Sequence, residues 1–587
     1  MADLLIGVQT QDLPTIGPNG VSPSEINTGG MLIYSDRGVD DVVPIHKADQ
    51  IPEIFGRYKA SYYGHYAMQG FFENLQGNSG TLYVKRMVPN DAVTASTSVN
   101  NADTPAEATW KFWAGRLGKK DPGIWGNQLM TTVTASSRGA STIATTTVAT
   151  DTWVEVVSTA PFQPYDWITV GDSTPATVQI ERIDESTNRL YFANADTVGS
   201  IFAATQAVTI VDRTVKVYMK DSDTGNIEEV EVISDLSIDP ASPYYWVDII
   251  NDPYIGSKYI FAEQLTTTAA GTYEDFPVVV ADAVANATQF TAGANGTALN
   301  TTAMASQLEY FDPFPVRWLT NTEAFSEAVW DDGEQYCRVR GDTVWVGSPT
   351  ANQTYAALVV WANKRRRSRK MYAWNNHVWL RVSDPIGIGP NPEKIVPNVG
   401  HLMGYAIWIN TVRGIHKVPA SRLQTPVGIR GLVGNLIDMR EITNLANVGL
   451  NSISDLGGSY AVRSGRSPSK LKEWWFVNAL IMSIYFKKSF EQSFVDLENE
   501  PNKAVLLQKI ASGMTEFARD FYVSSSNGGG EGGFADGTFN DVVKVIADDT
   551  INPIQKVSAG ELRANFYFKA PAPAERILIG VGLLFNG

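Results

Sequence analysis

The sequence of 587 residues contains few of the residue types that most often bind metals or act as nucleophiles. Its single cysteine, Cys337, cannot form an intramolecular disulfide bond or a multi-cysteine metal site, and its five histidines provide few ligands for zinc or copper. No histidine lies near Cys337 in the sequence, so we interpret it as a small buried side chain. His401 and His416 are too far apart for a local motif, and we interpret each as a core or contact histidine.

Sequence motifs of catalysis and nucleotide binding are also missing. There is no G-x-x-x-x-G-K-[ST] loop, which would bind phosphates, and no G-x-S-x-G turn of a serine hydrolase. The glycines at 387 and 389 precede a proline rather than a helix start, so we interpret them as part of a turn. The acidic pairs at 228–229 and 331–332 could flank a glycosidic bond, but such pairs are common on acidic surfaces. We therefore predict no enzymatic activity, no cofactor and no metal site.

Basic residues are outnumbered, with 47 Lys and Arg against 62 Asp and Glu, and the net charge is −15. An acidic surface repels phosphate backbones, so nucleic acid is disfavoured as a direct partner. One basic run, at 364–370, ends an expected helix, whose C-terminal dipole favours cations. We interpret this run as a solvated helix end or as a charge contact between subunits.

Long apolar runs and targeting segments are also missing. The N-terminus lacks the basic region and the apolar stretch of a signal peptide. The most apolar run, at 474–486, is shorter than the ~20 residues that a membrane-spanning helix needs. We interpret it as a buried helix, and we expect no stable membrane insertion.

Aromatic residues, by contrast, are abundant at 11%, with 15 tryptophans. We expect this aromatic area to be buried in cores or in subunit contacts. At roughly 100–200 residues per domain, the length predicts three to five domains. The pattern of elements predicts a multidomain α+β protein, with a mixed α/β core assembled from N- and C-terminal parts and β-rich inserted domains between them.

The predicted domains follow from changes in this pattern along the chain. Strand and helix patterns alternate in 21–90, the first part of the core, and return in 316–465, the second part. Between them, short runs of Thr, Val, Ile, Tyr and Trp at 91–265 predict a β-rich domain that carries a small inserted β-domain at about 136–212. The Ala-, Thr-, Gly- and Asn-rich stretch at 266–315 is predicted to be a linker or loop.

The last part of the chain, 466–587, is predicted to be a C-terminal α/β domain. Asn502 is a good N-cap, and apolar residues from Val505 to Phe521 follow at helical spacing. Two alternating strands, at 562–569 and 576–585, then close the chain.

Both termini are strand-like and apolar. Residues 1–20 form a short apolar segment and a Pro/Gly-rich linker, which we interpret either as a frayed terminus or as an arm that adds a strand to a neighbour's sheet. The predicted inter-subunit strand residues are Leu4, Leu5, Ile6, Val8, Ile577, Leu578, Ile579 and Val581.

An ordered series of motifs runs along the chain. Residues 71–74 read FFEN and precede a glycine and an expected strand that ends at Arg86, residues 121–127 read DPGIWGN, and residues 235–240 read DLSIDP. Later, residues 396–401 read VPNVGH, residues 413–420 read RGIHKVPA, and residues 500–502 read EPN. In this order the motifs resemble those of the tail sheath proteins of contractile-tailed bacteriophages and related contractile injection systems.

The resemblance implies a mechanical role without catalysis. A sheath protein forms hexameric rings that stack helically around a tail tube, linked by strands donated from both termini, and contraction drives the tube through the host cell envelope. The implied partners are further copies of the chain, the tail tube protein, and baseplate and tail terminator proteins. The implied location is the virion, assembled in the host bacterial cytoplasm. Two alternatives remain open: another virion protein, such as a capsid or adhesin subunit, and a β-rich polysaccharide-degrading enzyme.

Two further expectations concern orientation in such a sheath. The helix that follows residue 502 is expected to lie near the tube, where Lys503, Lys509 and Arg519 would make weak charge contacts with an acidic tube. The inserted β-domain is expected to face outward, because an insertion that faced the tube would collide with it.

Overall fold

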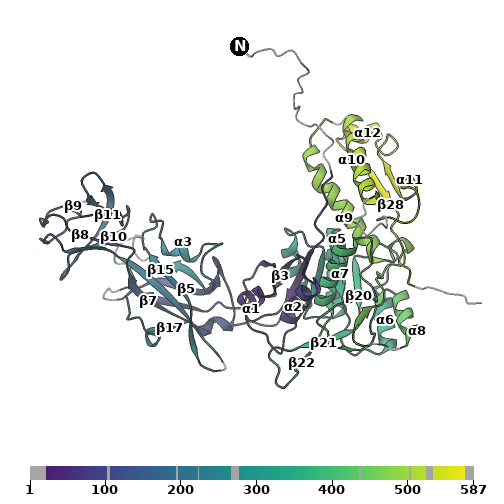
Figure 1. The fold of residues 1–587 in the computed structure, drawn as a ribbon, viewed down its shortest axis with the longest axis horizontal. Coiled ribbons are helices and arrows are strands. Elements are labelled where there is room, and N and C mark those ends of the chain that lie inside the picture. Colours follow the sequence, from purple (N-terminus) through teal and green to yellow (C-terminus); the bar gives the residue numbers. More distant parts are fainter. Residues whose placement is uncertain are drawn as a thin grey trace, which may run out of the picture.

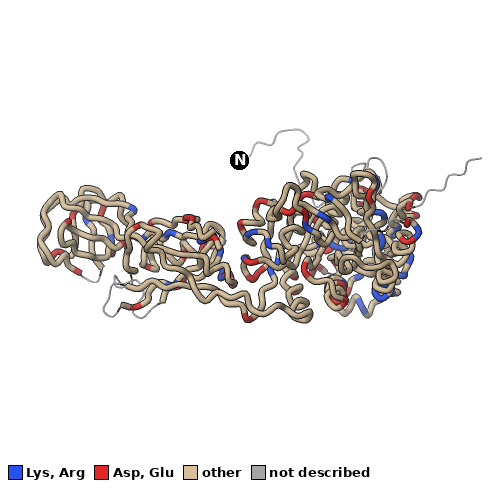
Figure 2. The backbone as a smooth tube through the Cα atoms, turned by 90° about the horizontal axis from the view of Figure 1, so that it is seen from below, with Lys and Arg blue, Asp and Glu red and all other residues tan. Residues whose placement is uncertain are grey.

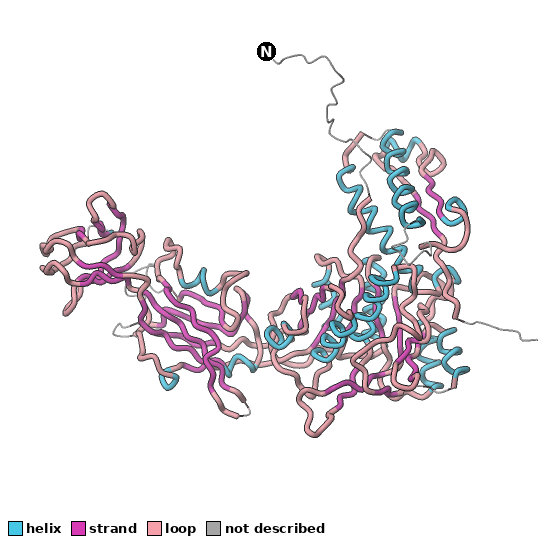
Figure 3. Tube along the Cα trace, in the orientation of Figure 1, coloured by secondary structure: helices cyan, strands magenta, loops and turns pink. Residues whose placement is uncertain are grey.

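A computed structural model describes residues 21–101, 106–193, 196–222, 224–265, 276–434, 436, 438–501, 504–523 and 533–575. The molecule is elongated, and helices are concentrated at one end while two β-rich domains follow one another toward the other end (Figure 1 and Figure 3). The perpendicular view in Figure 2 shows the same elongated outline, with two smaller lobes extending to one side of a larger body. This mixture of helices and sheets agrees with the predicted multidomain α+β class.

The core is built on a seven-stranded sheet in the order β2-β3-β1-β18-β19-β20-β24. Strands β1 and β18 pair in parallel, so the sheet joins segments of the chain that lie far apart in sequence. The strands are β1 (Thr28–Ile33), β2 (Val42–Ile45), β3 (Thr81–Arg86), β18 (Trp318–Asn321), β19 (Val344–Gly347), β20 (Ala373–Asn376) and β24 (Leu450–Asn451).

Helices cover both faces of this sheet. Met31 and Ile33 of β1 face one apolar cluster, with α2 (Gly64–Asn74) and α7 (Val399–Arg413), while Leu32 between them faces the other, with α5 (Glu327–Arg340). Because both faces are covered, every residue of the central strands β1, β18, β19 and β20 is buried, and buried residues do not alternate with exposed ones. The remaining core helices are α1 (Gln50–Phe55), α6 (Tyr355–Arg365) and α8 (Met439–Asn447).

Helices α2 and α7 pack closely because α7 carries glycines where it faces α2. A Cβ atom at Gly400 would lie 2.2 Å from the carbonyl oxygen of Ala67, and one at Gly404 would lie 2.2 Å from that of Phe71. Any larger side chain would force the helices apart, so these glycines set the helix–helix distance.

Two small sheets complete the core. One has the order β22-β21-β23, and the other pairs β25 with β26. Their strands are β21 (Trp379–Ser383), β22 (Glu393–Val396), β23 (Gly431–Val433), β25 (Ile453–Asp455) and β26 (Tyr460–Val462).

The first β-rich domain has two four-stranded sheets around one apolar core, with α3 (Trp246–Ile250) beside them. Trp110 and Trp246 stack at its centre, with ring centroids 4.0 Å apart. One sheet consists of β4 (Ser96–Asn100), β5 (Ala108–Arg116), β6 (Lys119–Lys120) and β16 (Ile260–Gln264); the other consists of β7 (Leu129–Ser136), β14 (Asp212–Lys220), β15 (Ile227–Leu236) and β17 (Thr288–Gln289).

The stretch predicted to be a linker or loop at 266–315 is less open than expected where the structure describes it. Phe276 and Phe290 are buried in the core of the first β-rich domain, and β17 pairs with β7. Further along, α4 (Thr301–Ser306) and a 3-10 helix (Gln307–Phe311) pack on the α/β core. Single aromatic anchors in a polar stretch produce no periodic pattern, which is why the sequence indicated only a linker.

The second β-rich domain is a six-stranded sheet in the order β8-β13-β10-β11-β12-β9, between residues 140 and 210. The chain leaves β7 to form it and returns in β14, which is the antiparallel neighbour of β7. Its strands are β8 (Ala140–Thr142), β9 (Trp153–Glu155), β10 (Trp167–Val170), β11 (Ala176–Asp184), β12 (Arg189–Phe192) and β13 (Ala207–Ile210). We call it the insert.

The C-terminal domain packs two long helices, α9 (Val477–Phe494) and α10 (Ala504–Val523), against a two-stranded sheet of β27 (Val543–Ile546) and β28 (Asn565–Phe568). Two short helices, α11 (Phe539–Val542) and α12 (Ile554–Ser558), lie beside it. Its centre is aromatic: Phe486 contacts Phe490, Phe517, Phe521, Phe534, Phe566 and Phe568. This cluster accounts for part of the aromatic excess.

Candidate functional site

Three side chains considered for catalysis, Cys337, His401 and His416, are buried. Cys337 is fully buried, and burial raises the pKa of its thiol, so it is a small core side chain as predicted. His401 and His416 are buried, and burial lowers the pKa of His401 to about 4. Among the described residues, no three His, Cys, Asp or Glu side chains are grouped to hold a metal ion. Within the same residues, no helix is long and apolar enough to cross a bilayer.

Arg365 is the buried residue of the basic run at 364–370, so the interpretation as a solvated helix end is wrong for it, whereas Lys364 and Arg367 are exposed and Arg369 and Lys370 are partly buried. Arg365 is 2% exposed, and its guanidinium carbon lies 3.9 Å from the ring centroid of Trp361. Arg369 forms two hydrogen bonds, of 3.0 and 2.8 Å, with the carboxylate of Glu334. Lys370 donates to the hydroxyl of Ser483 over 2.7 Å, and burial lowers its pKa to about 8. The partners of Arg369 and Lys370 lie on other helices, which a local charge pattern cannot show.

The core and the first β-rich domain are joined by buried charges. Arg86, at the end of β3, donates to Asp121 Oδ1 over 2.8 Å, and the backbone N–H of Gly38 donates to Asp121 Oδ2 over 2.8 Å. Arg37 lies over the rings of Trp125 and Tyr259, at 4.7 and 4.5 Å from their centroids. These contacts link the ends of core strands to loops of the first β-rich domain, so the two domains are joined by packed side chains.

A second buried arginine joins the insert to the first β-rich domain. Arg138 follows β7, and its side chain forms ion pairs with Asp212, at 2.9 Å, and with Asp166 of the insert, at 2.5 Å. Its guanidinium carbon lies 3.9 Å from the ring centroid of Tyr244. The insert is therefore fixed at its base by contacts on both sides of the connection.

In the part of the chain that the structure describes, the two-stranded sheet of the C-terminal domain has outer edges to which strands could be added. Within the described residues, β27 pairs with β28 and with no third strand. Phe566 and Phe568 are partly buried against α9, while Tyr567 between them is 52% exposed. A two-stranded sheet is marginal by itself, and additional strands would extend both the hydrogen bonds and the apolar face.

The structure brings two of the predicted tube-facing residues onto one helix. Lys509 is half-buried and Arg519 is exposed on α10, where the guanidinium carbon of Arg519 lies 4.8 Å from the ring centroid of Phe539. Glu516 and Asp520 lie on the same exposed face, so its charge is mixed. Lys503 lies outside the described residues, as do the predicted strand residues Leu4, Leu5, Ile6, Val8, Ile577, Leu578, Ile579 and Val581.

Reasoning from single residues did not foresee the structural roles of Arg86, Asp121, Gly400 and Gly404. A signal was present for three of them, because Arg86, Asp121 and Gly400 fall in the motifs that carry the resemblance to sheath proteins. Their motifs therefore coincide with a buried domain joint and a close helix packing.

The fold is that of a tail sheath protein. The structure is similar to the crystal structure of the sheath tail protein Lin1278 from Listeria innocua, with 11% sequence identity, a TM-score of 0.51, and 91% of each chain covered. Two solved assemblies align with about half of this chain. One is the sheath complex of an extracellular contractile injection system, PVC, in the contracted state, with 16% sequence identity, 48% of this chain and 75% of that chain covered, and a TM-score of 0.39. The other is the baseplate of the anti-feeding prophage, with 13% sequence identity, 50% of this chain and 76% of that chain covered, and a TM-score of 0.40. No protein-family model and no curated protein matches the sequence. The resemblance drawn from the motifs is thus confirmed for the fold.

Proposed function

We propose that this chain is the structural and mechanical subunit of a contractile tail sheath. In this proposal it polymerises as stacked hexameric rings around a tail tube, and contraction drives the tube through the host cell envelope. The observation that carries the proposal is the similarity to the Listeria innocua sheath tail protein, which extends over 91% of both chains. Its direct partners would be further copies of itself, the tube protein, and baseplate and terminator proteins, within a virion assembled in the host bacterial cytoplasm.

The open edges of β27 and β28 are the proposed acceptors for strands donated by neighbouring subunits. The apolar residues Leu4, Leu5, Ile6 and Val8 of one copy and Ile577, Leu578, Ile579 and Val581 of another supply the strands. Backbone hydrogen bonds hold such strands irrespective of the rotation between rings. The Pro/Gly-rich segment that follows residue 8 would act as a flexible linker while the rings move past one another.

The shape of the molecule supports an orientation within the sheath. The C-terminal domain and the insert lie at opposite ends of the elongated chain (Figure 1). If α10 faces the tube through Lys509 and Arg519, the insert then projects from the outer surface, where it avoids a collision with the tube. Its fixed base at Arg138 would hold it at a constant angle on every subunit.

Contraction in this proposal needs no nucleotide and no catalytic residue. The extended array is a kinetic trap, and the contracted array buries more complementary surface between subunits. The packed joint at Arg86 and Asp121 would make the core and the first β-rich domain move together, so that movement is concentrated in the linkers between subunits.

Electron microscopy of the purified full chain tests the proposal. Wild-type protein should form long hollow cylinders in negative stain, whereas deletion of residues 1–16 should leave a folded monomer by circular dichroism and sedimentation velocity. Cylinders formed equally well by the truncated chain would rule out the donated N-terminal strand. Closed shells or isolated fibres from the wild type would instead favour a capsid or adhesin subunit, and a chain that stays monomeric would reopen the enzyme alternative.

A further inference from the structure

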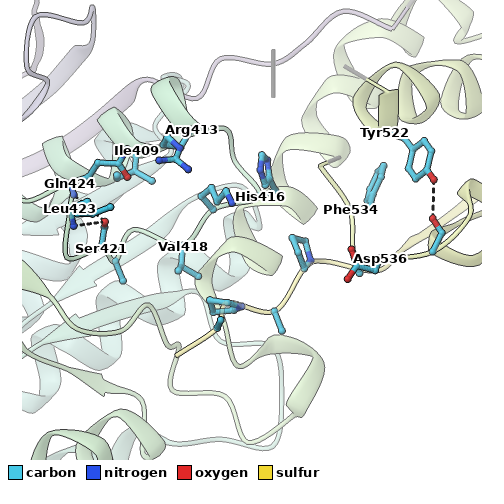
Figure 4. A pocket seen from close by; sticks show the side chains of 18 residues that line it. Ile409, Arg413, His416, Val418, Ser421, Leu423, Gln424, Tyr522, Phe534 and Asp536 are labelled. Carbon is cyan, nitrogen blue, oxygen red and sulfur yellow. Dashed lines mark hydrogen bonds between the residues drawn. The ribbon is translucent and has the colours of Figure 1, made fainter. Parts of the chain in front are cut away.

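Two hollows of the molecule differ in what encloses them. One, of about 950 Å³, lies between two domains: Arg413 and Leu423, from the end of α7 and the loop after it, are on one side, and Tyr522 and Asp536 of the C-terminal domain are on the other (Figure 4). It belongs to the joint between these domains. A second hollow, of about 490 Å³, has walls from the α/β core alone. We call it the core pocket.

Helix α2 forms one wall of the core pocket, and the segment 428–430 forms another. The face of α2 that lines the pocket carries residues at helical spacing: Tyr66, Gln69, Gly70 and Glu73. Asn74 of the same helix holds the second wall in place. The N–H of Val427 donates to Asn74 Oδ1 over 2.9 Å, and the amide of Asn74 donates to the carbonyl oxygen of Val427 over 3.1 Å. The two walls are therefore tied to one another by side-chain and backbone contacts.

The imidazole of His401 is buried in the lining of the core pocket, against Gly70. A Cβ atom at Gly70 would lie 2.2 Å from this ring, so only glycine lets the ring approach α2 so closely. In the described part of the chain, Nδ1 of His401 has no hydrogen-bond partner. Burial lowers the pKa of His401 to about 4 and so keeps the ring neutral at pH 7. A neutral imidazole does not repel a cation and has a nitrogen lone pair to offer it.

One carboxylate and one guanidinium group line the core pocket. Glu73 Oε1 accepts from the amide of Gln69 over 2.9 Å, while Arg430 donates to the hydroxyl of Ser383 over 3.1 Å and to the carbonyl oxygen of Pro392 over 3.4 Å. Among the described residues, neither Glu73 nor Arg430 forms an ion pair. Because opposite charges attract strongly at short range, two that line one hollow without pairing leave separate positions for a cation and for an anion.

The position for a cation lies beside Gly428. A Cβ atom at Gly428 would lie 2.1 Å from Glu73 Oε2 and 3.8 Å from His401 Nε2, so the carboxylate and the imidazole border the same space. Burial and, to a smaller extent, the charge of Glu73 raise the pKa of the Tyr58 hydroxyl, which indicates that the carboxylate is also near this ring. A carboxylate, an imidazole nitrogen and an aromatic ring are groups that bind an ammonium group.

The rest of the lining is partly apolar and includes Val382, Pro385 and Ile429. The charges of Glu73 and Arg430 cancel, which favours a ligand that carries both signs and no net charge. We propose that the core pocket binds a free α-amino acid with an apolar side chain, its ammonium group at Glu73 and His401 and its carboxylate at Arg430. A basic side chain of another polypeptide would satisfy Glu73 but leave Arg430 without a partner. The volume is in the range of small-molecule sites.

Isothermal titration calorimetry of the full chain with L-leucine and L-phenylalanine tests the inference. Two analogues of phenylalanine each lack one charge: 2-phenylethylamine has no carboxylate, and 3-phenylpropionate has no ammonium group. We expect each analogue to bind at least about tenfold more weakly than phenylalanine, because each loses one charge-assisted interaction. Absence of binding for both amino acids up to about 10 mM would overturn the proposal.

Glu73→Gln and Arg430→Gln separate the two charged positions. In Glu73→Gln, phenylalanine should bind no better than 3-phenylpropionate, and in Arg430→Gln it should bind no better than 2-phenylethylamine. Arg381→Gln is the matched control, since Arg381 is exposed on β21 outside the pocket, and it should bind all three ligands as the wild type does. Equal weakening of all three ligands by Glu73→Gln and by Arg430→Gln would reflect a change in pocket structure and would overturn the assigned positions.

The ligand-free protein provides a second test. If a double-mutant cycle of Glu73→Gln and Arg430→Gln in urea denaturation showed coupling, the two side chains would pair with each other in solution, and the proposal would be overturned. We expect no coupling. These measurements are independent of the proposed sheath function, because they concern binding to the folded chain whether or not it forms cylinders. Cylinders from a chain that binds neither amino acid would overturn this inference alone.

Discussion

Arg86 and Asp121 form a buried ion pair that joins the α/β core to the first β-rich domain. The distance from Arg86 Nη1 to Asp121 Oδ1 is 2.8 Å, and both side chains are almost completely buried. Arg86 also donates to the carbonyl oxygens of Ser35, Gly38 and Pro122, so its donors are distributed across the joint. Burial raises the pKa of Asp121, although Arg86 and Arg37 act in the opposite direction.

Removing one partner of this pair should be strongly destabilising. Arg86→Met removes the ion-pair partner of a buried carboxylate, and we expect a loss of about 3–5 kcal/mol in the free energy of unfolding. Urea denaturation followed by tryptophan fluorescence measures the loss. Arg57→Ala serves as the control, since it removes an exposed ion pair with Asp221 and should cost about 1 kcal/mol or less. Equal losses for the two variants would contradict the structural role of Arg86.

The close packing of α2 on α7 predicts that two glycines tolerate no side chain. Gly404→Ala would place its Cβ 2.2 Å from the carbonyl oxygen of Phe71, and the helices would have to separate. We expect a destabilisation of about 1–3 kcal/mol for this variant and for Gly400→Ala, measured as a lowered thermal midpoint. The matched control is Gly513→Ala in α10, where the nearest atoms lie at an ordinary 3.4 Å. There the gain in helix propensity should stabilise by about 0.5–1 kcal/mol.

The buried carboxyl group of Glu323 should make the free energy of unfolding depend on pH. Its carboxylate accepts the backbone N–H groups of Tyr63 and Gly64 at the start of α2, at 3.0 and 2.7 Å, but burial dominates and raises its pKa to about 7. Between its ordinary pKa and pH 7, the folded protein holds a proton that the unfolded chain has lost. Stability therefore falls as the pH rises through this range, by on the order of 3 kcal/mol for this group, and then levels off.

Glu323→Gln should remove this contribution. Urea denaturation at pH 5, 6, 7 and 8 should show wild type losing stability relative to the variant as the pH rises, with no further divergence above pH 8. Glu516→Gln, at an exposed position on α10, serves as the control and should run parallel to wild type. Parallel curves for Glu323→Gln and wild type would show that the carboxylate is ionised throughout this pH range.

Elements with a strong local pattern could be predicted from the sequence. The strand Thr81–Arg86 and the helix with the apolar stripe from Val505 to Phe521 are observed, the latter as α10. The strand predicted at 562–569 is shorter in the structure, where β28 spans Asn565–Phe568. Its partner β27 also has four residues. The alternation of apolar and polar residues predicts which side chains share a face of a strand, whereas the length of the strand depends on the neighbouring strand with which it pairs.

Contacts between distant segments could not be predicted from residue patterns. In the basic run at 364–370, Arg369 and Arg365 contact Glu334 and Trp330 of another helix, and the local charge pattern does not indicate either contact. Phe290 anchors a stretch whose composition indicates a linker. In both cases the residue type is ordinary, and its role comes from a tertiary partner. The order of the sheath motifs carried information that single residues did not.

The exposed face of α10 gives the sharpest test of the proposed orientation. Lys509→Glu combined with Arg519→Glu should reduce sheath assembly on an acidic tube, since each weak exposed pair contributes about 0.2–1 kcal/mol but recurs on every subunit. Glu516→Lys on the same face should leave assembly unchanged or increase it. Arg519→Lys keeps the charge and controls for the packing of Arg519 on Phe539. Pelleting of sheath with purified tubes at low and high salt measures the effect, which added salt should diminish. If the double variant pelleted with tubes as well as the wild type does and had a normal circular dichroism spectrum, another surface of the protein would lie against the tube.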